Sequence, residues 1–349
     1  MHLRLTLLVL AVDFPIKCFA FHDGGVANCK GCHTIHNSEN GALVDPNSPW
    51  GAAHFLRDGT ASDVCLSCHG TSLGSELSPS PLNPASTKGG GNFVFLKEDN
   101  LNDGPQGAMN PIPGSAAGHN INAPGYGLSP ETTTNRSPGG NYPSGAMSCT
   151  SCHNPHGNSN FRMLYGIGMV IQGNYIFTAA APVATGISIT DPASESNSRH
   201  TAYRSGMSAW CGNCHGNFHD NSSNGFEPTF KHKAGEKLGG GIASNYARYN
   251  GTDNPTGGNF STAYLAQVPF EDAWVTSTGT EGPTDNSRVM CLSCHRAHAS
   301  SAPHSGRWDF NLTFLNQDGV QSGSYPIPNP YPSPTQKRLC EKCHGVNNL

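Results

Sequence analysis

The sequence predicts a fold that is mostly irregular coil, with short helical turns and a few short strands, around a core that side chains alone do not fill. Three observations predict this architecture. Gly and Pro supply 42 and 26 of the 349 residues, and both favour turns over long helices or strands. Hydrophobic residues make up 36% of the chain, which is little apolar surface to offset the entropy lost on ordering it. Six copies of one short cysteine motif indicate what completes the core.

The first 20 residues predict a secretory signal peptide that is cleaved after Ala20. Arg4 precedes an apolar run from Leu5 to Val12, and CFA stands before the cleavage point. The run is too short to span a bilayer, which takes about 20 apolar residues, and the residues before Cys18 do not fit a lipoprotein signal. We therefore expect a secreted protein without a membrane span, which passes through the periplasm to the outer cell surface or the extracellular medium.

The other twelve cysteines form six pairs of one kind, which we number as sites 1 to 6 in chain order. Each pair has two residues between its members and is followed at once by a histidine. The pairs are Cys29/Cys32, Cys65/Cys68, Cys149/Cys152, Cys211/Cys214, Cys291/Cys294 and Cys340/Cys343, and the histidines are His33, His69, His153, His215, His295 and His344.

The histidine after each pair decides between three interpretations. Cysteines of an exported chain can form disulfides, and C-x-x-C pairs can hold zinc, but neither needs a histidine at this position. Histidine is 17 of 349 residues, so finding it six times in six by chance has a probability on the order of 10⁻⁸. C-x-x-C-H is the attachment motif of haem c, in which both thiols bind the porphyrin and the histidine is the proximal ligand of iron. The sequence therefore predicts six covalently attached haems c, whose apolar porphyrins complete the core.

The motifs and the segments between them predict one domain over residues 21–349. The six sites have no fixed period, and haems must lie close together to exchange electrons, which leaves little room for separate domains. We expect a short helical turn at each site. We also expect a small hairpin from the apolar runs 163–177 and 186–190, and a weak helical pattern covers 261–274.

A haem iron has a second axial position, which histidine, methionine or an exogenous molecule can fill. His36, His156 and His298 lie three residues after a proximal histidine, and His219 lies four after one. Residues three or four apart on a helical turn point the same way, so these side chains cannot reach the far face of their own haem. We expect each to bind the iron of a neighbouring haem.

The remaining histidines complete the set of distal ligands. We expect His119 and His232 to be the fifth and sixth, with His22 as a reserve. The other histidines, His54, His200 and His304, are assigned to loops. Met207 and Met290, two methionines near the motifs, are assigned to packing.

At this point the motifs resemble a known family. FHDGGVANCKGCHTIHNS, GMSAWCGNCH, CLSCHRAHAS and RLCEKCHG together are similar to the hexahaem extracellular cytochromes of metal-reducing bacteria that polymerise into conductive filaments. The resemblance spans the chain from Phe21 to site 6, with a shorter chain in the loops around sites 2–3 and 5–6. It implies six bis-histidine haems in a head-to-tail filament. It also implies that His36 binds the fifth haem of a neighbouring subunit, where site 5 here ends at His295.

The function implied by this resemblance is long-range electron transfer to external acceptors such as metal oxides, with other cytochromes as redox partners. No residue is assigned acid–base or nucleophilic work, so we do not expect an enzyme. Two alternatives stay open: a carrier that remains a monomer in the periplasm or outer membrane, and a multihaem oxidoreductase. The latter needs an open iron, often marked by lysine in place of the motif histidine, whereas all six motifs end in histidine. No basic run indicates a nucleic-acid partner.

Overall fold

The structure, a computed structural model, describes residues 29–70, 77, 89–97, 114–187, 198–219, 234–249, 258–259, 268–280, 282–310 and 340–344. The α-helices there are short: α1 (Cys29–Cys32), α2 (Ala61–His69), α3 (Gly114–Ala117), α4 (Met207–Cys211), α5 (Gly216–His219), α6 (Gly239–Arg248), α8 (Cys291–Cys294) and α9 (Glu341–His344). Single 3₁₀ turns lie between them: η2 (Ala53–Phe55), η3 (Phe93–Leu96), η5 (Pro124–Tyr126), η6 (Ser144–Ala146), η7 (Cys149–Ser151), η8 (Phe161–Met163), η9 (Gln172–Asn174) and η10 (Pro303–Ser305).

The strands of the described ranges pair only two at a time, always antiparallel. They are β1 (Ser38–Glu39) with β2 (Ala42–Leu43), β3 (Val170–Ile171) with β4 (Tyr175–Ile176), and β5 (Val183–Thr185) with β6 (Ala202–Ser205). The expected pairing of the run 163–177 with the run 186–190 was wrong. The run 163–177 forms a hairpin by itself, with Val170 opposite Ile176. Gly173, with a φ of 79°, allows that turn. Of the run 186–190, residues 188–190 lie outside the described residues.

The weak helical pattern over 261–274 was also wrong where the structure describes it. Residues 268–274 form bends and an isolated bridge, in which Glu271 pairs with Arg288. The longest described helix is instead α6, whose first three residues are glycines. Glycine is among the weakest helix formers, so no helix was predicted there. Tertiary packing stabilises it, because α6 lies against α9 at site 6.

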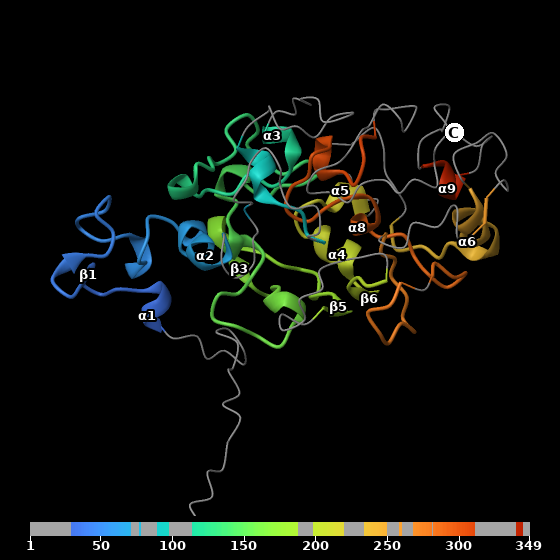
Figure 1. The fold of residues 1–349 in the computed structure, drawn as a ribbon, viewed down its shortest axis with the longest axis horizontal. Helices are drawn as coiled ribbons and strands as arrows, with labels where there is room; N and C mark the ends of the chain where they lie inside the picture. Colours follow the sequence, from blue (N-terminus) through green and yellow to red (C-terminus); the bar gives the residue numbers. More distant parts are fainter. Residues whose placement is uncertain are drawn as a thin grey trace, which may run out of the picture.

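The helices α1, α2, α4, α8 and α9 follow one another along the molecule in chain order, whereas α6, which precedes α8 in the chain, lies beyond it beside α9 (Figure 1). Figure 1 shows α1 and β1 at one end, α2 and β3 next, α4 and α8 in the middle, and α6 and α9 at the other end. No helix in the described ranges has the length and hydropathy that crossing a bilayer requires. The expected signal peptide, residues 1–20, lies outside the described residues, and the boundary of the single domain stays a prediction.

The side-chain core is thin and adjoins the cysteine motifs. Its main cluster includes Leu66, Phe95, Tyr142 and Phe177, and the half-buried Cys149 and Cys214 pack against it. A smaller cluster contains the two methionines near the motifs, Met207 and Met290, and confirms that they are packing residues. The apolar side chains therefore gather around the positions where the motifs would carry their cofactors.

Candidate haem sites

Each cysteine motif forms one helical turn, as the sequence predicted. The turns are α1, the end of α2, η7, the junction after α4, α8 and α9. In five of them the proximal histidine N–H donates to the carbonyl of the first cysteine: His33 to Cys29 (2.9 Å), His153 to Cys149 (3.0 Å), His215 to Cys211 (3.0 Å), His295 to Cys291 (2.9 Å) and His344 to Cys340 (3.2 Å). No disulfide joins any two of the twelve motif cysteines, all of which lie in the described ranges. Because residues three apart lie on one face of such a turn, both thiols of a motif can reach one porphyrin.

Backbone carbonyls hold four of the proximal imidazoles at Nδ1. The acceptors are His54 O for His33 (3.0 Å), Arg162 O for His153 (2.8 Å), Pro138 O for His215 (2.7 Å) and His304 O for His295 (2.9 Å). A carbonyl can only accept, so Nδ1 carries the proton in each ring. The lone pair then lies on Nε2, which is the arrangement that metal-binding histidines adopt.

Burial lowers the pKa of three histidines at the motifs or facing them, His119, His215 and His295. Desolvation, with a smaller contribution from the nearby His119, lowers the pKa of His215 to about 4. Desolvation also lowers the pKa of His119 and of His295 below the usual range. A neutral imidazole is the form that binds a metal, so these side chains are available as ligands at neutral pH without losing a proton.

Two pairs of histidines face each other at the separation that one metal ion requires. The ring centroids of His33 and His156 are 6.3 Å apart with an interplanar angle of 21°, and those of His119 and His215 are 6.0 Å apart. Two imidazoles on opposite sides of a metal, with metal–nitrogen bonds of about 2.0 Å, have centroids roughly 6 Å apart. The residues therefore fit a bis-histidine iron at sites 1 and 4.

His298 lies beside site 3. Its ring stacks on Phe93 with a centroid distance of 4.6 Å. Hydrogen bonds from Cys65 and Ser62 have the larger effects in lowering the pKa of the Cys149 thiol, and His298 also lies close enough to this thiol to lower it. The second histidine of site 5 is thus placed at site 3, as the second histidine of site 3 is placed at site 1.

The remaining candidate histidines lie in different environments. His36 is exposed on the loop between α1 and β1. His219 ends α5, but its side chain, like His232 and His22, lies outside the described residues. His54 and His304 are loop residues, as predicted. His200 was assigned to a loop, yet it is buried and its Nδ1 bonds to Thr201 O at 2.9 Å, as in a metal ligand; its local sequence carries no motif that could have revealed this.

Neighbouring thiols place the six sites in one row, in chain order. Successive sites have cysteines close enough to shift each other's pKa: Cys32 with Cys68, Cys65 with Cys149, Cys152 with Cys214, Cys211 with Cys291, and Cys294 with Cys343. The first, third and fifth of these contacts join the second cysteines of two successive motifs. The second and fourth contacts join the first cysteines of two successive motifs. The row follows the long axis of the molecule in Figure 1.

The row is built from a repeated pair of sites. α2 packs on η7, and α4 packs on α8, so that sites 2 and 3 are joined in the same way as sites 4 and 5. In the first pair the Ser62 hydroxyl accepts from Cys149 N at 3.2 Å, and in the second the Ser208 hydroxyl accepts from Cys291 N at 3.1 Å. Both serines lie three residues before the first cysteine of their own site. This two-site repeat was not predicted from the sequence, because each serine contact joins residues more than 80 positions apart.

Comparison with known proteins gives a consistent result. No protein-family model matches the chain. The C-type cytochrome OmcS of Geobacter sulfurreducens is 30% identical over 94% of this chain and 94% of its own length. Two solved structures, an outer-membrane cytochrome S filament and OmcS nanowires, both from that organism, match with a TM-score of 0.71 and 27% identity over 93% of this chain and 99% of theirs. With six C-x-x-C-H motifs in one row, this chain belongs to the family of OmcS-like C-type cytochromes, whose cofactor is haem c.

Proposed function

We propose that this protein carries electrons over long distances outside the cell, through a head-to-tail filament of identical chains whose six haems form a continuous row. Haem iron with two histidine ligands exchanges single electrons and leaves no position for a substrate. The twelve motif cysteines attach the haems and the six motif histidines are the proximal ligands. The acceptors are external, such as metal oxides, and other cytochromes supply the electrons. No enzymatic reaction is part of this proposal.

The observation that supports the proposal is the position of the second histidine of each H-x-x-H motif, a series that we call the histidine relay. His156 of site 3 faces the proximal His33 of site 1, and His298 of site 5 lies beside Cys149 of site 3. Each H-x-x-H motif therefore supplies the site two positions earlier in the row. If site 5 followed the same rule, its ligand would come from an H-x-x-H motif after His298, but the sequence has no such motif there. The motif that has no earlier site in its own chain is that of site 1, whose second histidine is His36.

A second chain placed head to tail resolves both ends of this relay. Its His36 would bind the iron at site 5 of the first chain, as His298 binds at site 3. The same placement would bring site 6 beside the next site 1 and so complete a third even–odd pair. The remaining distal ligands are His119 for site 4, with His219 and His232 for the two other even sites and His200 as a further candidate.

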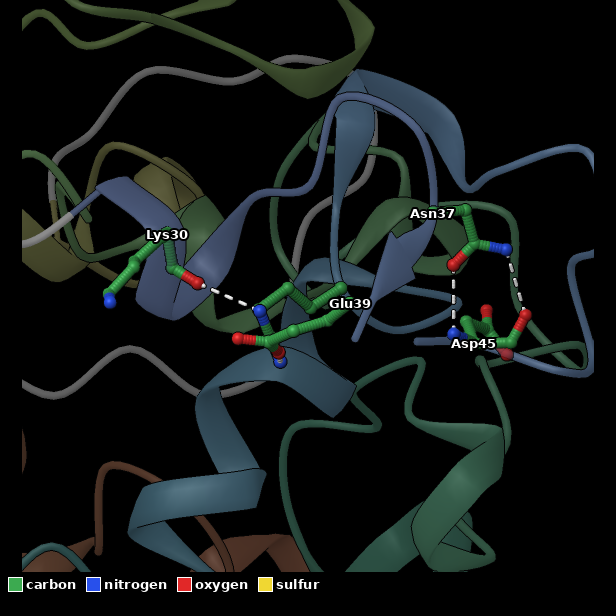
Figure 2. Close-up of polar contacts among 5 residues, drawn as sticks. Lys30, Asn37, Glu39 and Asp45 are labelled. Carbon is green, nitrogen blue, oxygen red and sulfur yellow. Dashed lines mark hydrogen bonds and ion pairs between the residues drawn. The ribbon is translucent and has the colours of Figure 1, made fainter. Parts of the chain in front are cut away.

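The segment around His36 has the surface of an interface. Trp50 is 99% exposed, Ile35 77% and Phe55 62%, and exposed apolar residues in one place mark a protein–protein contact. The segment is braced internally: in Figure 2, the Asn37 side chain accepts from Asp45 N (2.8 Å) and donates to Asp45 O (2.9 Å). An ion pair between Arg57 and Glu39 (2.7 Å) adds to it. The expected signal peptide supports export through the periplasm.

The test of the proposal is electron microscopy of the purified, matured protein, combined with a ligand-binding assay. We expect filaments one chain wide, and a reduced spectrum that carbon monoxide leaves unchanged because every iron has two histidines. Discrete particles at all protein concentrations would contradict the filament. Stoichiometric carbon monoxide binding to the parent filament would contradict the bis-histidine row.

Substitution of His119 tests the ligand assignment inside one chain. His119→Ala should retain six haems and still form filaments, but its reduced form should bind about one carbon monoxide per chain, because the iron at site 4 keeps only His215. The reduction potential of that haem should rise, since the ferric form loses a nitrogen donor. His304→Asn is the control, because it removes an imidazole that the structure places in a turn. A His119→Ala protein that is as inert to carbon monoxide as the control would refute the assignment.

A further inference from the structure

The residues with a left-handed backbone are concentrated at the odd-numbered sites. Nine described residues other than glycine have a positive φ. Three are asparagines, which tolerate this conformation. The other six form three adjacent pairs: His54/Phe55 (57° and 56°), Arg162/Met163 (50° and 56°) and His304/Ser305 (61° and 57°). Each pair belongs to a loop that returns to the proximal histidine of site 1, 3 or 5.

Each pair occupies the centre of a tight turn of type I′, in which both central residues need a positive φ. The closing hydrogen bonds are Leu56 N to Ala53 O (3.3 Å), Leu164 N to Phe161 O (3.0 Å) and Gly306 N to Pro303 O (3.1 Å). Asn-Gly and Asp-Gly are the usual residues of such turns, so His-Phe, Arg-Met and His-Ser are disfavoured choices. We call these three turns, Ala53–Leu56, Phe161–Leu164 and Pro303–Gly306, the clamp turns.

The two central carbonyls of a clamp turn hold two successive groups of the haem motif. At site 3, Arg162 O accepts from His153 Nδ1 (2.8 Å), and Met163 O accepts from Asn154 N (2.8 Å), the next group along the chain. Site 1 repeats this with His54 O and Phe55 O, which accept from His33 Nδ1 (3.0 Å) and Thr34 N (2.7 Å).

Site 5 has the same contacts, from His304 O to His295 Nδ1 (2.9 Å) and from Ser305 O to Arg296 N (2.6 Å). A third bond, from the residue after the turn to the second cysteine carbonyl, also recurs: Arg57 N to Cys32 O (2.9 Å), Tyr165 N to Cys152 O (3.0 Å) and Arg307 N to Cys294 O (2.8 Å). The motif is thus fixed on both sides of its proximal histidine, and a left-handed pair lets two consecutive carbonyls reach it.

Burial of the first side chain in each pair does not explain the strained backbone, although Ser305, the second residue at site 5, is buried. His54, Arg162 and His304, the first residues of the three pairs, are all exposed. At site 4, Pro138 O accepts the hydrogen bond from His215 Nδ1, and the positive φ beside it belongs to Gly139 (64°), where it causes no strain. The turns that place residues other than glycine at a positive φ occur at the three sites that have a second histidine three residues after the first.

We propose that the clamp turns are positioning elements that orient both histidines of each H-x-x-H motif. The first carbonyl fixes the plane of the proximal imidazole and makes it a stronger donor to iron. The second fixes the backbone that leads to the other histidine, whose ring serves the haem two sites away. One turn therefore sets the ligand geometry of two haems. The inference rests on the ligand roles under Proposed function, but not on filament formation.

The clamp turn of site 3 offers a matched pair of variants. Arg162→Val and Arg162→Asn both remove an exposed guanidinium that lies 5.7 Å from the Phe161 ring. Valine, which is β-branched, strongly disfavours a positive φ, whereas asparagine accepts it. We expect six haems by mass in both proteins. The ferric low-spin electron paramagnetic resonance g values, which depend on the angle between the axial imidazoles, should match the parent in Arg162→Asn. In Arg162→Val they should change for the haems of sites 1 and 3.

Identical spectra for the two variants and the parent would overturn the proposal, as would a lower Tm of Arg162→Val with unchanged g values, which indicates a purely structural turn. His304→Val and His304→Asn repeat the comparison at site 5. They test the role of the clamp turn if the Arg162→Val protein does not accumulate. Electron microscopy of the same samples keeps the two proposals apart. A parent protein without filaments contradicts the proposed function, while the comparison of g values between variants still decides the role of the clamp turn.

Discussion

His36→Ala is expected to convert long filaments into single chains or assemblies of a few subunits, with six haems still attached. The six C-x-x-C-H motifs remain intact in this variant, so haem attachment is unaffected. What is lost is the ligand that one chain donates to site 5 of the next. A metal–ligand bond at every interface is directional and strong, and the exposed Ile35, Trp50 and Phe55 then hold the contact only by apolar burial, which is worth about 25 cal/mol per Å².

The measurements are filament length by electron microscopy and carbon monoxide binding by the reduced protein. We expect about one carbon monoxide per His36→Ala chain, because site 5 then has only His295. His54→Asn is the matched control: it removes another exposed histidine from the same segment and keeps a residue that accepts a positive φ. Long His36→Ala filaments with every iron still low-spin would show that another residue fills site 5.

The chain without haem is expected to be unfolded, which is the second large effect. The longest described helix has 10 residues, and helices shorter than roughly 12–15 residues are marginal by themselves. The described strands occur only in two-stranded pairs, which are also marginal in water. Core side chains pack directly against Cys149 and Cys214, so the porphyrins that these thiols attach would enlarge this cluster, and their removal takes away that apolar contact.

The comparison is between the matured protein and a variant in which the twelve motif cysteines are replaced by serine. Far-ultraviolet circular dichroism and urea titration should show a cooperative transition for the first and none for the second. The expected loss is the entire free energy of unfolding, on the order of 5–15 kcal/mol for a domain. A cooperative transition in the serine variant would mean that side chains alone form the core. The single variant Cys18→Ser, outside the motifs, is the control.

The number and position of the haem sites could be predicted from the sequence because attachment is a local property. Two thiols and a proximal imidazole within five residues form one helical turn, whatever the rest of the chain does. Cys149 therefore begins η7, Cys152 caps its end, and the His153 N–H after it donates to the Cys149 carbonyl, as predicted. The hairpin inside 163–177 was half predictable: its apolar residues indicated strands, but Gly173 decided that the run pairs with itself.

The second ligands could be predicted as a set but not as partners. His156 follows site 3 in the sequence, yet it faces His33 more than 100 positions earlier. His119 lies before site 3 and faces His215 of site 4. Such pairs depend on how long Gly- and Asn-rich loops close, and local sequence carries no information about that closure. His200 has the hydrogen bond of a ligand without any motif, so only its tertiary position identifies it.

The sequence by itself determined the cofactor, its number and its proximal ligands, since covalent attachment needs only neighbouring residues. Only the tertiary structure decided the order of the sites along one row, the repeat that joins site 2 to 3 and site 4 to 5, and the clamp turns. His54 and Phe55 illustrate the reason: neither residue prefers a positive φ, and they adopt it because two carbonyls must reach His33 and Thr34 at once. That requirement arises from contacts more than 20 residues apart in the chain, and it overrides what the local residues would choose.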